Sequence, residues 1–184
     1  MDIKRKRQCT AEALGMPYII TDQELRNLFA ECDREPFCKQ SPCRHLIILV
    51  IFRLIYCCGL RPNEGRELLR DDFNEVEGTL FVRKNKSHKE RRIPLSDDVA
   101  AMCRNYLHDS RKVIPNTEYM FPSPDGGSYE RKWLSETFRR LWNASNPDSP
   151  AKKSVFIFSD TDLLLPYLRN GLMKTQISTR KYHT

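Results

Sequence analysis

The sequence lacks the features that would place the chain in or across a membrane. Its longest apolar run, from Leu46 to Gly59, has 14 residues and includes Arg53, whereas a membrane-spanning helix needs about 20 apolar residues. No apolar stretch follows the basic first residues, so no signal peptide is visible. We therefore expect a cytoplasmic protein with no membrane partner, in which this run forms a buried helix.

The cysteines likewise lack the pattern of a disulfide framework or a zinc site. There are 7 of them, an odd number, and no pair has the C-x-x-C spacing, so we expect reduced thiols. Cys32, Cys38, Cys43 and His45 lie close together, but their gaps of 5, 4 and 1 residues do not match the ligand spacing of structural zinc sites. We expect no metal and no other cofactor.

The charge balance points to an anionic partner. The 184 residues include 31 lysines and arginines against 24 aspartates and glutamates, which gives a formal net charge of +7, and the isoelectric point is near 9.1. With 40% hydrophobic residues, the chain can bury one modest core. A basic surplus is typical of proteins that bind a polyanion, although it does not determine the fold.

Capping signals and hydrophobic spacing predict a mainly helical chain. Residues 1–20 carry clustered basic side chains without an apolar pattern and are expected to form a linker or arm. Thr21 and Glu24 form a capping box before a helix at 22–32. Gly59 is placed to end the apolar helix that follows.

Three more helices are predicted downstream. Pro62 suits the first turn of a helix that ends near Asp72. Ser96 is placed to cap the next helix, whose apolar stripe comprises Val99, Met102, Cys103, Tyr106 and Leu107. A last helix is expected from Tyr129 to Trp142. Its mainly apolar inner face comprises Trp133, Leu134, Thr137, Phe138, Leu141 and Trp142.

Two β-rich segments predict a hairpin. Thr79–Arg83 and Arg91–Leu95 are joined by a polar stretch that contains Lys84, Lys86 and Lys89. The expected fold class is therefore α+β: mainly α-helical, with a small antiparallel β-sheet.

The last predicted helix has a basic outer face. This face carries Arg131, Lys132, Arg139 and Arg140. Ordinary solvation and contact with DNA are both compatible with such a face. If it does face DNA, the hairpin supplies further basic candidates in Lys84, Lys89 and Arg91.

Two segments resemble the tyrosine recombinases, the phage-integrase family. Residues 57–65, CCGLRPNEG, are similar to the box around the first catalytic arginine, with Arg61 at its position and Glu64 at that of the acidic residue. Residues 86–95, KSHKERRIPL, resemble the second and third strands, with Lys86 at the position of the hairpin lysine. The resemblance spans roughly residues 17–145 and implies a truncated form of the family's catalytic-domain fold.

The resemblance also implies roles for these residues. In this family a tyrosine attacks a DNA phosphodiester and expels a 5′-hydroxyl without metal or nucleotide. Arg61 would bind the non-bridging phosphate oxygens, Lys86 would protonate the leaving oxygen, and Glu64 would orient Arg61. Lys84 and Lys89 are rivals of Lys86. Alternatively, Arg61 forms only a salt bridge at a helix junction, Lys86 is an ordinary turn lysine, and Glu64 is structural.

The last part of the chain departs from the family pattern. No His-x-x-Arg box follows the basic helix, and the family's second arginine and histidine are not recognisable there. A one-nucleotide slip in the coding sequence near residue 155 would account for the break, because the neighbouring frame permits such a box. We therefore expect residues 151–184 to be an aberrant, poorly ordered tail. Tyr182, in the segment STRKYHT, is the competing candidate for the nucleophile.

The sequence thus predicts a partial tyrosine-recombinase catalytic domain at residues 21–150. The expected function is that of the DNA-binding part of a site-specific integrase of a mobile element, unable to cleave DNA as written. The alternative is a non-catalytic DNA-binding module that antagonises a full-length integrase. Double-stranded DNA is the expected partner; the family forms tetramers on DNA, and we expect this chain to be a monomer in solution.

Overall fold

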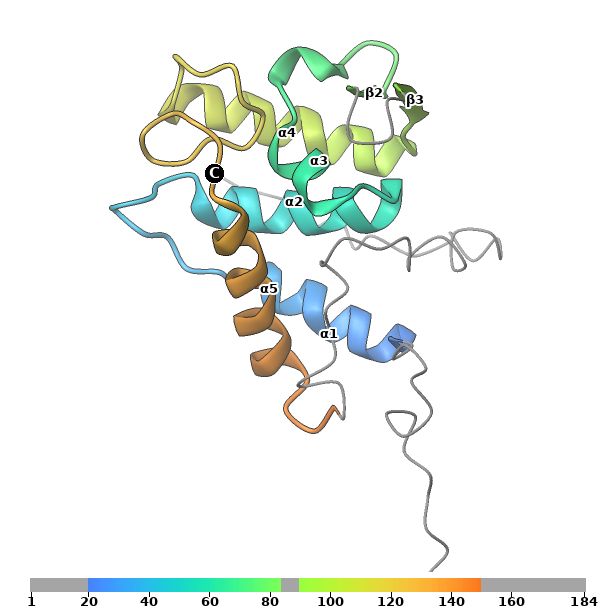
Figure 1. Cartoon of the computed structure of the whole chain (residues 1–184), viewed down its shortest axis with the longest axis vertical. Coiled ribbons are helices and arrows are strands. Elements are labelled where there is room, and N and C mark those ends of the chain that lie inside the picture. The colour runs from blue at the N-terminus through green and yellow to red at the C-terminus, as the bar shows by residue number, and fades with distance from the viewer. Residues whose placement is uncertain (1–19, 84–89, 150–184) are drawn as a thin grey trace, which may run out of the picture.

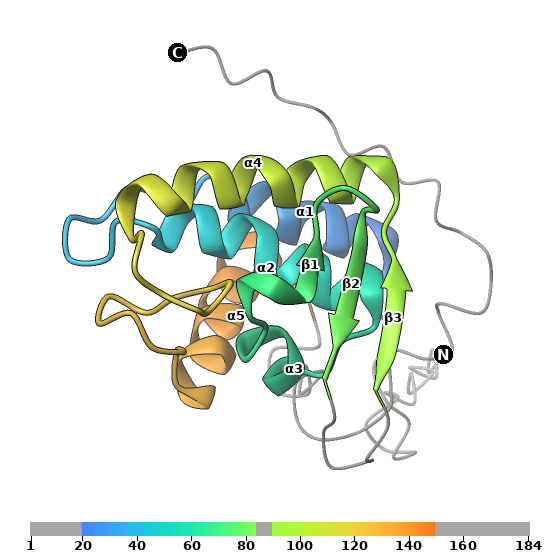
Figure 2. The same ribbon diagram turned by 90° about the horizontal axis from the view of Figure 1, so that it is seen from above.

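The computed structural model describes residues 20–83 and 90–149. Helix α2 (Arg44–Cys58) lies at the centre, and α4 (Asp97–Val113) runs along one side of it. On the other side, α1 (Asp22–Cys32) packs against α5 (Arg131–Ser145), as Figures 1 and 2 show. The mainly helical architecture predicted from the sequence is confirmed. No helix in the described ranges is long and apolar enough to cross a membrane.

The central helix is buried because its sequence is apolar on nearly every face. Ile47, Ile48, Leu54 and other side chains of α2 are 1% exposed or less, and burying one such side chain contributes about 1.5–3 kcal/mol to stability. The helix ends at Gly59, which has φ = 57° in the left-handed region that glycine adopts without a steric penalty. The predicted helix stop is therefore confirmed.

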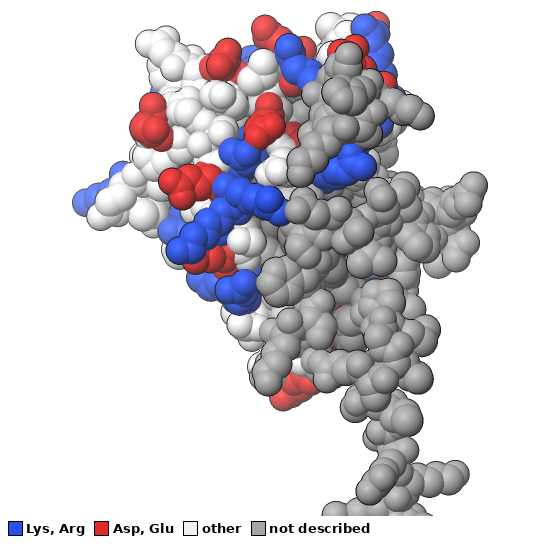
Figure 3. Space-filling view, in the orientation of Figure 1, with Lys and Arg blue, Asp and Glu red and all other residues white. Residues whose placement is uncertain are grey.

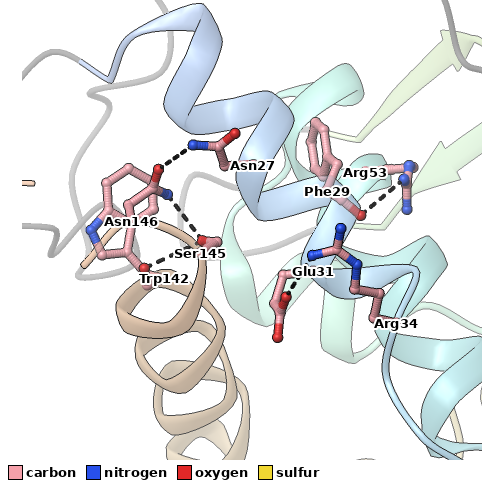
Figure 4. A network of polar contacts seen from close by, with 8 residues as sticks. All are labelled: Asn27, Phe29, Glu31, Arg34, Arg53, Trp142, Ser145 and Asn146. Carbon is pink, nitrogen blue, oxygen red and sulfur yellow. Dashed lines mark hydrogen bonds and ion pairs between the residues drawn. The ribbon is translucent and has the colours of Figure 1, made fainter. Parts of the chain in front are cut away.

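Arg53 is the one strongly basic side chain within this apolar run, and its charge is fully engaged. One of its terminal nitrogens donates to the Leu49 carbonyl at 2.7 Å, and the other lies 2.8 Å from the Asp33 carboxylate. The second nitrogen also donates to the Phe29 carbonyl at 3.4 Å, the contact drawn in Figure 4. A buried charge is tolerated when it is paired in this way, so Arg53 joins α2 to the end of α1.

A polar network also joins the start of α1 to the end of α5. The Asn27 side-chain amide donates to Asn146 Oδ1 at 3.1 Å (Figure 4). The Asn146 amide also donates to the Glu24 carbonyl at 3.1 Å. The capping box predicted for Thr21 and Glu24 is present. The two helices are thereby held in a fixed relative position.

The predicted hairpin forms two strands of a small antiparallel sheet with the order β1-β2-β3. β2 (Thr79–Val82) pairs with β3 (Arg91–Pro94), so that Val82 lies opposite Arg91. The sequence did not predict the two-residue strand β1 (Phe73–Asn74), which pairs with the other edge of β2.

The helix predicted from Pro62 to Asp72 is wrong in its second half. Helix α3 (Pro62–Arg66) ends after five residues, and a 3₁₀ turn, η2 (Arg70–Asp72), follows. Between them, the chain pairs with residues 118–120: the Leu68 carbonyl accepts from the Met120 amide at 2.8 Å, and the Arg70 amide donates to the Glu118 carbonyl at 2.8 Å. This tertiary pairing replaces the helical hydrogen bonds.

The two predicted apolar stripes lie in the core. On α4, Val99, Cys103, Tyr106 and Leu107 are buried and Met102 is partly buried. On α5, the buried side chains are Leu134, Thr137, Phe138, Leu141 and Trp142. The helix begins at Arg131 rather than Tyr129, because Glu130 is its N-cap with an extended backbone, and it continues to Ser145. Tyr129 stacks on Trp133 with ring centroids 3.7 Å apart.

Candidate functional site

Arg61 lies at the junction between α2 and α3, as predicted. It is the N-cap residue of α3, with an extended backbone. Its neighbour Leu60 is buried, whereas the Arg61 side chain is 44% exposed. The backbone is therefore fixed in the core while the guanidinium remains accessible to a ligand.

Close packing of α3 on α2 sets the position of this junction. A Cβ atom added to Gly65 would lie 2.8 Å from Ile55 Cγ1, which is closer than two carbon atoms can approach without displacement. Only glycine allows α3 to approach α2 to this distance. The short helix that follows Arg61 is thereby seated on the central helix.

Glu64 is the centre of a buried ionic cluster. Its side chain is 2% exposed. Oε2 accepts the Arg61 backbone N–H at 2.9 Å and Arg91 Nη2 at 2.6 Å, while Oε1 accepts Arg91 Nη1 at 3.2 Å. The Arg61 guanidinium lies 3.6 Å from Oε1. One carboxylate therefore holds two arginines that are 30 residues apart in sequence.

The charges in this cluster favour the ionised form of Glu64. Burial by itself would raise the pKa of the carboxyl, but the hydrogen bonds from Arg91 and from the Arg61 backbone, with the charges of both guanidiniums, lower it below its ordinary value. Glu64 is therefore an anion at neutral pH. An anion at this place restrains the nearby guanidiniums at the surface.

A second buried carboxylate holds the other strand of the hairpin. Arg83, just after β2, donates from Nε to Asp72 Oδ1 at 2.6 Å, and the Asp72 side chain is 2% exposed. Asp72 Oδ2 also accepts the Leu69 amide at 2.8 Å. The end of β2 and the start of β3 are thus both anchored to the α3–η2 segment, which lies beside them in Figure 2.

Acidic neighbours partly neutralise the basic face of α5. Arg131, Lys132, Arg139 and Arg140 are all exposed. Arg140 lies 2.7 Å from the Glu35 carboxylate, and Lys132 lies 3.6 Å from that of Glu136. Figure 3 shows basic side chains near the middle of this face of the molecule with acidic side chains among them.

α3 is also linked to the start of α5. Arg66 Nη1 donates to the Ser128 hydroxyl at 2.9 Å and to the Tyr129 carbonyl at 2.7 Å. These bonds join the segment that carries Arg61 to the turn before the basic helix.

The structure brings together Arg61, Glu64 and Arg91 among the predicted site residues. Lys84, Lys86, Lys89 and Tyr182 lie outside the described residues, as do most of the predicted N-terminal arm and the tail. Sequence reasoning missed the pairing of Arg91 with Glu64 and of Arg83 with Asp72. Only the Arg61–Glu64 contact has a local signal, because residues three apart at a helix start form a capping box.

The thiols near the site are not activated. Burial, together with the neighbouring Cys57, raises the pKa of Cys58 to about 12, although Arg91 opposes this shift. Six cysteines of the described ranges are free. Within these ranges no group of three or more histidines, cysteines or acids is arranged to hold a metal ion.

The fold matches that of tyrosine-recombinase catalytic domains. The structure of XerH site-specific recombinase bound to its difH substrate aligns with a TM-score of 0.62 and 19% sequence identity, and the match covers 84% of this chain and 44% of that one. The XerA recombinase structure aligns with a TM-score of 0.59 and 18% identity over 73% of this chain and 44% of that chain. The fold predicted from the two sequence motifs is thus confirmed.

A model of the phage integrase family matches residues 19–154, and the chain belongs to this family. A probable integrase/recombinase protein of Methanocaldococcus jannaschii is 29% identical over 112 residues, which cover 60% of this chain and 34% of the relative. Tyrosine recombinase XerA of Pyrococcus furiosus is 31% identical over 106 residues, covering 58% of this chain and 33% of the relative. The chain spans about a third of the length of these curated relatives.

Proposed function

We infer that this chain is the DNA-binding part of a site-specific tyrosine recombinase that serves the integration and recombination of a mobile element. The observation that carries this proposal is the buried Glu64 carboxylate, which holds the half-exposed Arg61 guanidinium at the surface. An arginine that is restrained but still accessible is suited to binding an anion.

The chemistry of phosphate suits Arg61. A guanidinium is planar, permanently charged, and can donate two parallel hydrogen bonds to the non-bridging oxygens of a phosphodiester. In strand cleavage the same donors would stabilise the negative charge that develops on these oxygens. We assign this role to Arg61, and the protonation of the leaving 5′-oxygen to Lys86, with Lys84 and Lys89 as the other candidates.

Exposed basic side chains of α5 would add contacts to the DNA backbone. Phosphate contacts supply most non-specific affinity, whereas contacts to base edges supply sequence preference. We assign phosphate contacts to Arg131, Lys132, Arg139 and Arg140. The solved structure of XerH holds its difH substrate, which supports double-stranded DNA as the partner of this chain as well.

We propose that the chain binds DNA without cleaving it, because no second arginine and histidine of the family pattern are recognisable after α5. A suicide substrate with a nick beside the cleavage position tests this, since it traps a covalent protein–DNA adduct. We expect no adduct. An adduct that disappears in Tyr182→Phe would show instead that the chain cleaves DNA and that Tyr182 is the nucleophile.

DNA binding itself is tested by fluorescence anisotropy with a labelled duplex over a range of salt concentrations. Each phosphate contact should contribute about 0.9 to the slope of log K against log salt, so several contacts predict a steep fall in affinity. Affinity that does not change with salt would contradict the proposal. Sedimentation of the free chain tests the accompanying expectation of a monomer in solution.

A further inference from the structure

Arg91 binds both carboxylate oxygens of Glu64, although it comes from a different element. It is the first residue of β3, whereas Glu64 lies in α3, 27 residues earlier. The two terminal nitrogens of Arg91 meet the two oxygens of Glu64, at 3.2 and 2.6 Å. The arrangement is bidentate and therefore fixes the orientation of the carboxylate as well as its position.

The same carboxylate makes the contacts that hold Arg61. Oε2, which accepts the shorter bond from Arg91, also accepts the Arg61 backbone N–H at 2.9 Å. Oε1, which accepts the longer one, lies 3.6 Å from the Arg61 guanidinium. A rotation of the carboxylate away from Arg91 would therefore disturb both contacts to Arg61.

We propose that Arg91 is a positioning residue, which orients Arg61 for phosphate binding through the shared carboxylate of Glu64. The inference rests on the proposed function in that the ligand of Arg61 is a DNA phosphate. It also reassigns Arg91 from DNA contact to a role inside the protein. This link ties the start of β3 to the start of α3.

The Arg83–Asp72 pair provides a matched control. Like Arg91, Arg83 belongs to the hairpin, carries one positive charge and binds a carboxylate that is 2% exposed. Asp72 holds the Leu69 amide, however, and not Arg61. Arg83→Gln therefore removes an ion pair of the same kind without removing a group that holds Arg61.

Hydrogen exchange at the Arg61 backbone amide reports the position of Glu64 in the absence of DNA. In Arg91→Gln we expect this amide to exchange about three- to tenfold faster, relative to the core amide of Leu107, because its acceptor is no longer held. Arg91→Lys keeps the charge but not the bidentate geometry and should show a smaller increase. Arg83→Gln should leave the ratio unchanged. An unchanged ratio in Arg91→Gln, or an equal increase in Arg83→Gln, would overturn the proposal.

A double-mutant cycle on DNA affinity separates positioning from direct contact. Arg91→Gln alone should weaken binding of a fixed duplex, but Arg61→Gln combined with Arg91→Gln should bind within about twofold of Arg61→Gln alone. If the affinity loss of the double variant equals the product of the losses of the two single variants, Arg91 contacts DNA itself and the positioning role is overturned. If the unmodified chain does not bind the duplex, the proposed function fails, whereas the exchange of the Arg61 amide still decides whether Arg91 holds Arg61 through Glu64.

Discussion

Glu64 Oε2 lies 2.9 Å from the backbone nitrogen of Arg61, at the point where α3 begins. The contact satisfies a backbone donor that has no helical partner at the start of a helix. Since the same carboxylate also binds Arg91 and lies near the Arg61 guanidinium, it combines helix capping with the support of a surface arginine. Glu64 is consequently both a structural residue and a supporting residue of the candidate site.

Glu64→Gln should make the chain less stable and less sensitive to acid. The folded state lowers the pKa of Glu64 below its ordinary 4.5, so its stabilising contribution is complete above pH 4.5 and is lost as the pH falls through that value toward the folded pKa. Urea unfolding at several pH values measures this. At pH 7 the free energy of unfolding of the variant should be about 2 kcal/mol lower than that of the unmodified chain, and below pH 4.5 it should fall less steeply with decreasing pH. If stability falls equally steeply below pH 4.5 in the variant and in the unmodified chain, Glu64 is not ionised in the cluster.

Gly65→Ala should destabilise the chain by overpacking the contact between α3 and α2. The added Cβ would meet Ile55 Cγ1 at 2.8 Å, and such overpacking costs about 1–3 kcal/mol. Gly127→Ala is the control, because its Cβ would meet its neighbours at 3.7 Å or more. Chemical denaturation measures both variants. If Gly65→Ala and Gly127→Ala are equally stable, α3 can shift on α2 without cost.

Much of this fold could be predicted from local patterns. The capping box at Thr21, the stop at Gly59 and the apolar stripes of α4 and α5 depend on residues within a few positions of each other. The early end of α3 could not be predicted in this way, since it depends on pairing with residues 118–120. The site shows the same division: the Arg61–Glu64 contact is local, whereas Arg91 reaches Glu64 only after the hairpin has formed.

Arg139 and Arg140 are adjacent on the exposed face of α5 but should respond differently to replacement by glutamine. Arg139→Gln should lower the salt slope of DNA binding by about 1 and leave stability within about 0.5 kcal/mol. Arg140→Gln should in addition lower the free energy of unfolding by up to about 1 kcal/mol, because the buried Glu35 carboxylate loses one of its two arginine partners and keeps Arg44, 2.9 Å away. Anisotropy titrations and urea unfolding measure the two effects. If neither variant changes DNA binding, the basic side chains of this face are exposed to solvent and do not contact DNA.

The most direct test of the account is the affinity for duplex DNA of Arg61→Lys and Arg61→Gln, measured at one low salt concentration. Arg34→Gln, which removes an exposed arginine paired with Glu31, controls for the change in net charge. We predict that Arg61→Gln weakens binding by about tenfold or more and that Arg34→Gln has a smaller effect. Arg61→Lys should recover only part of the loss, because an ammonium cannot donate in parallel to two phosphate oxygens. Equal losses in Arg61→Gln and Arg34→Gln would contradict the claim that Arg61 is the phosphate-binding residue.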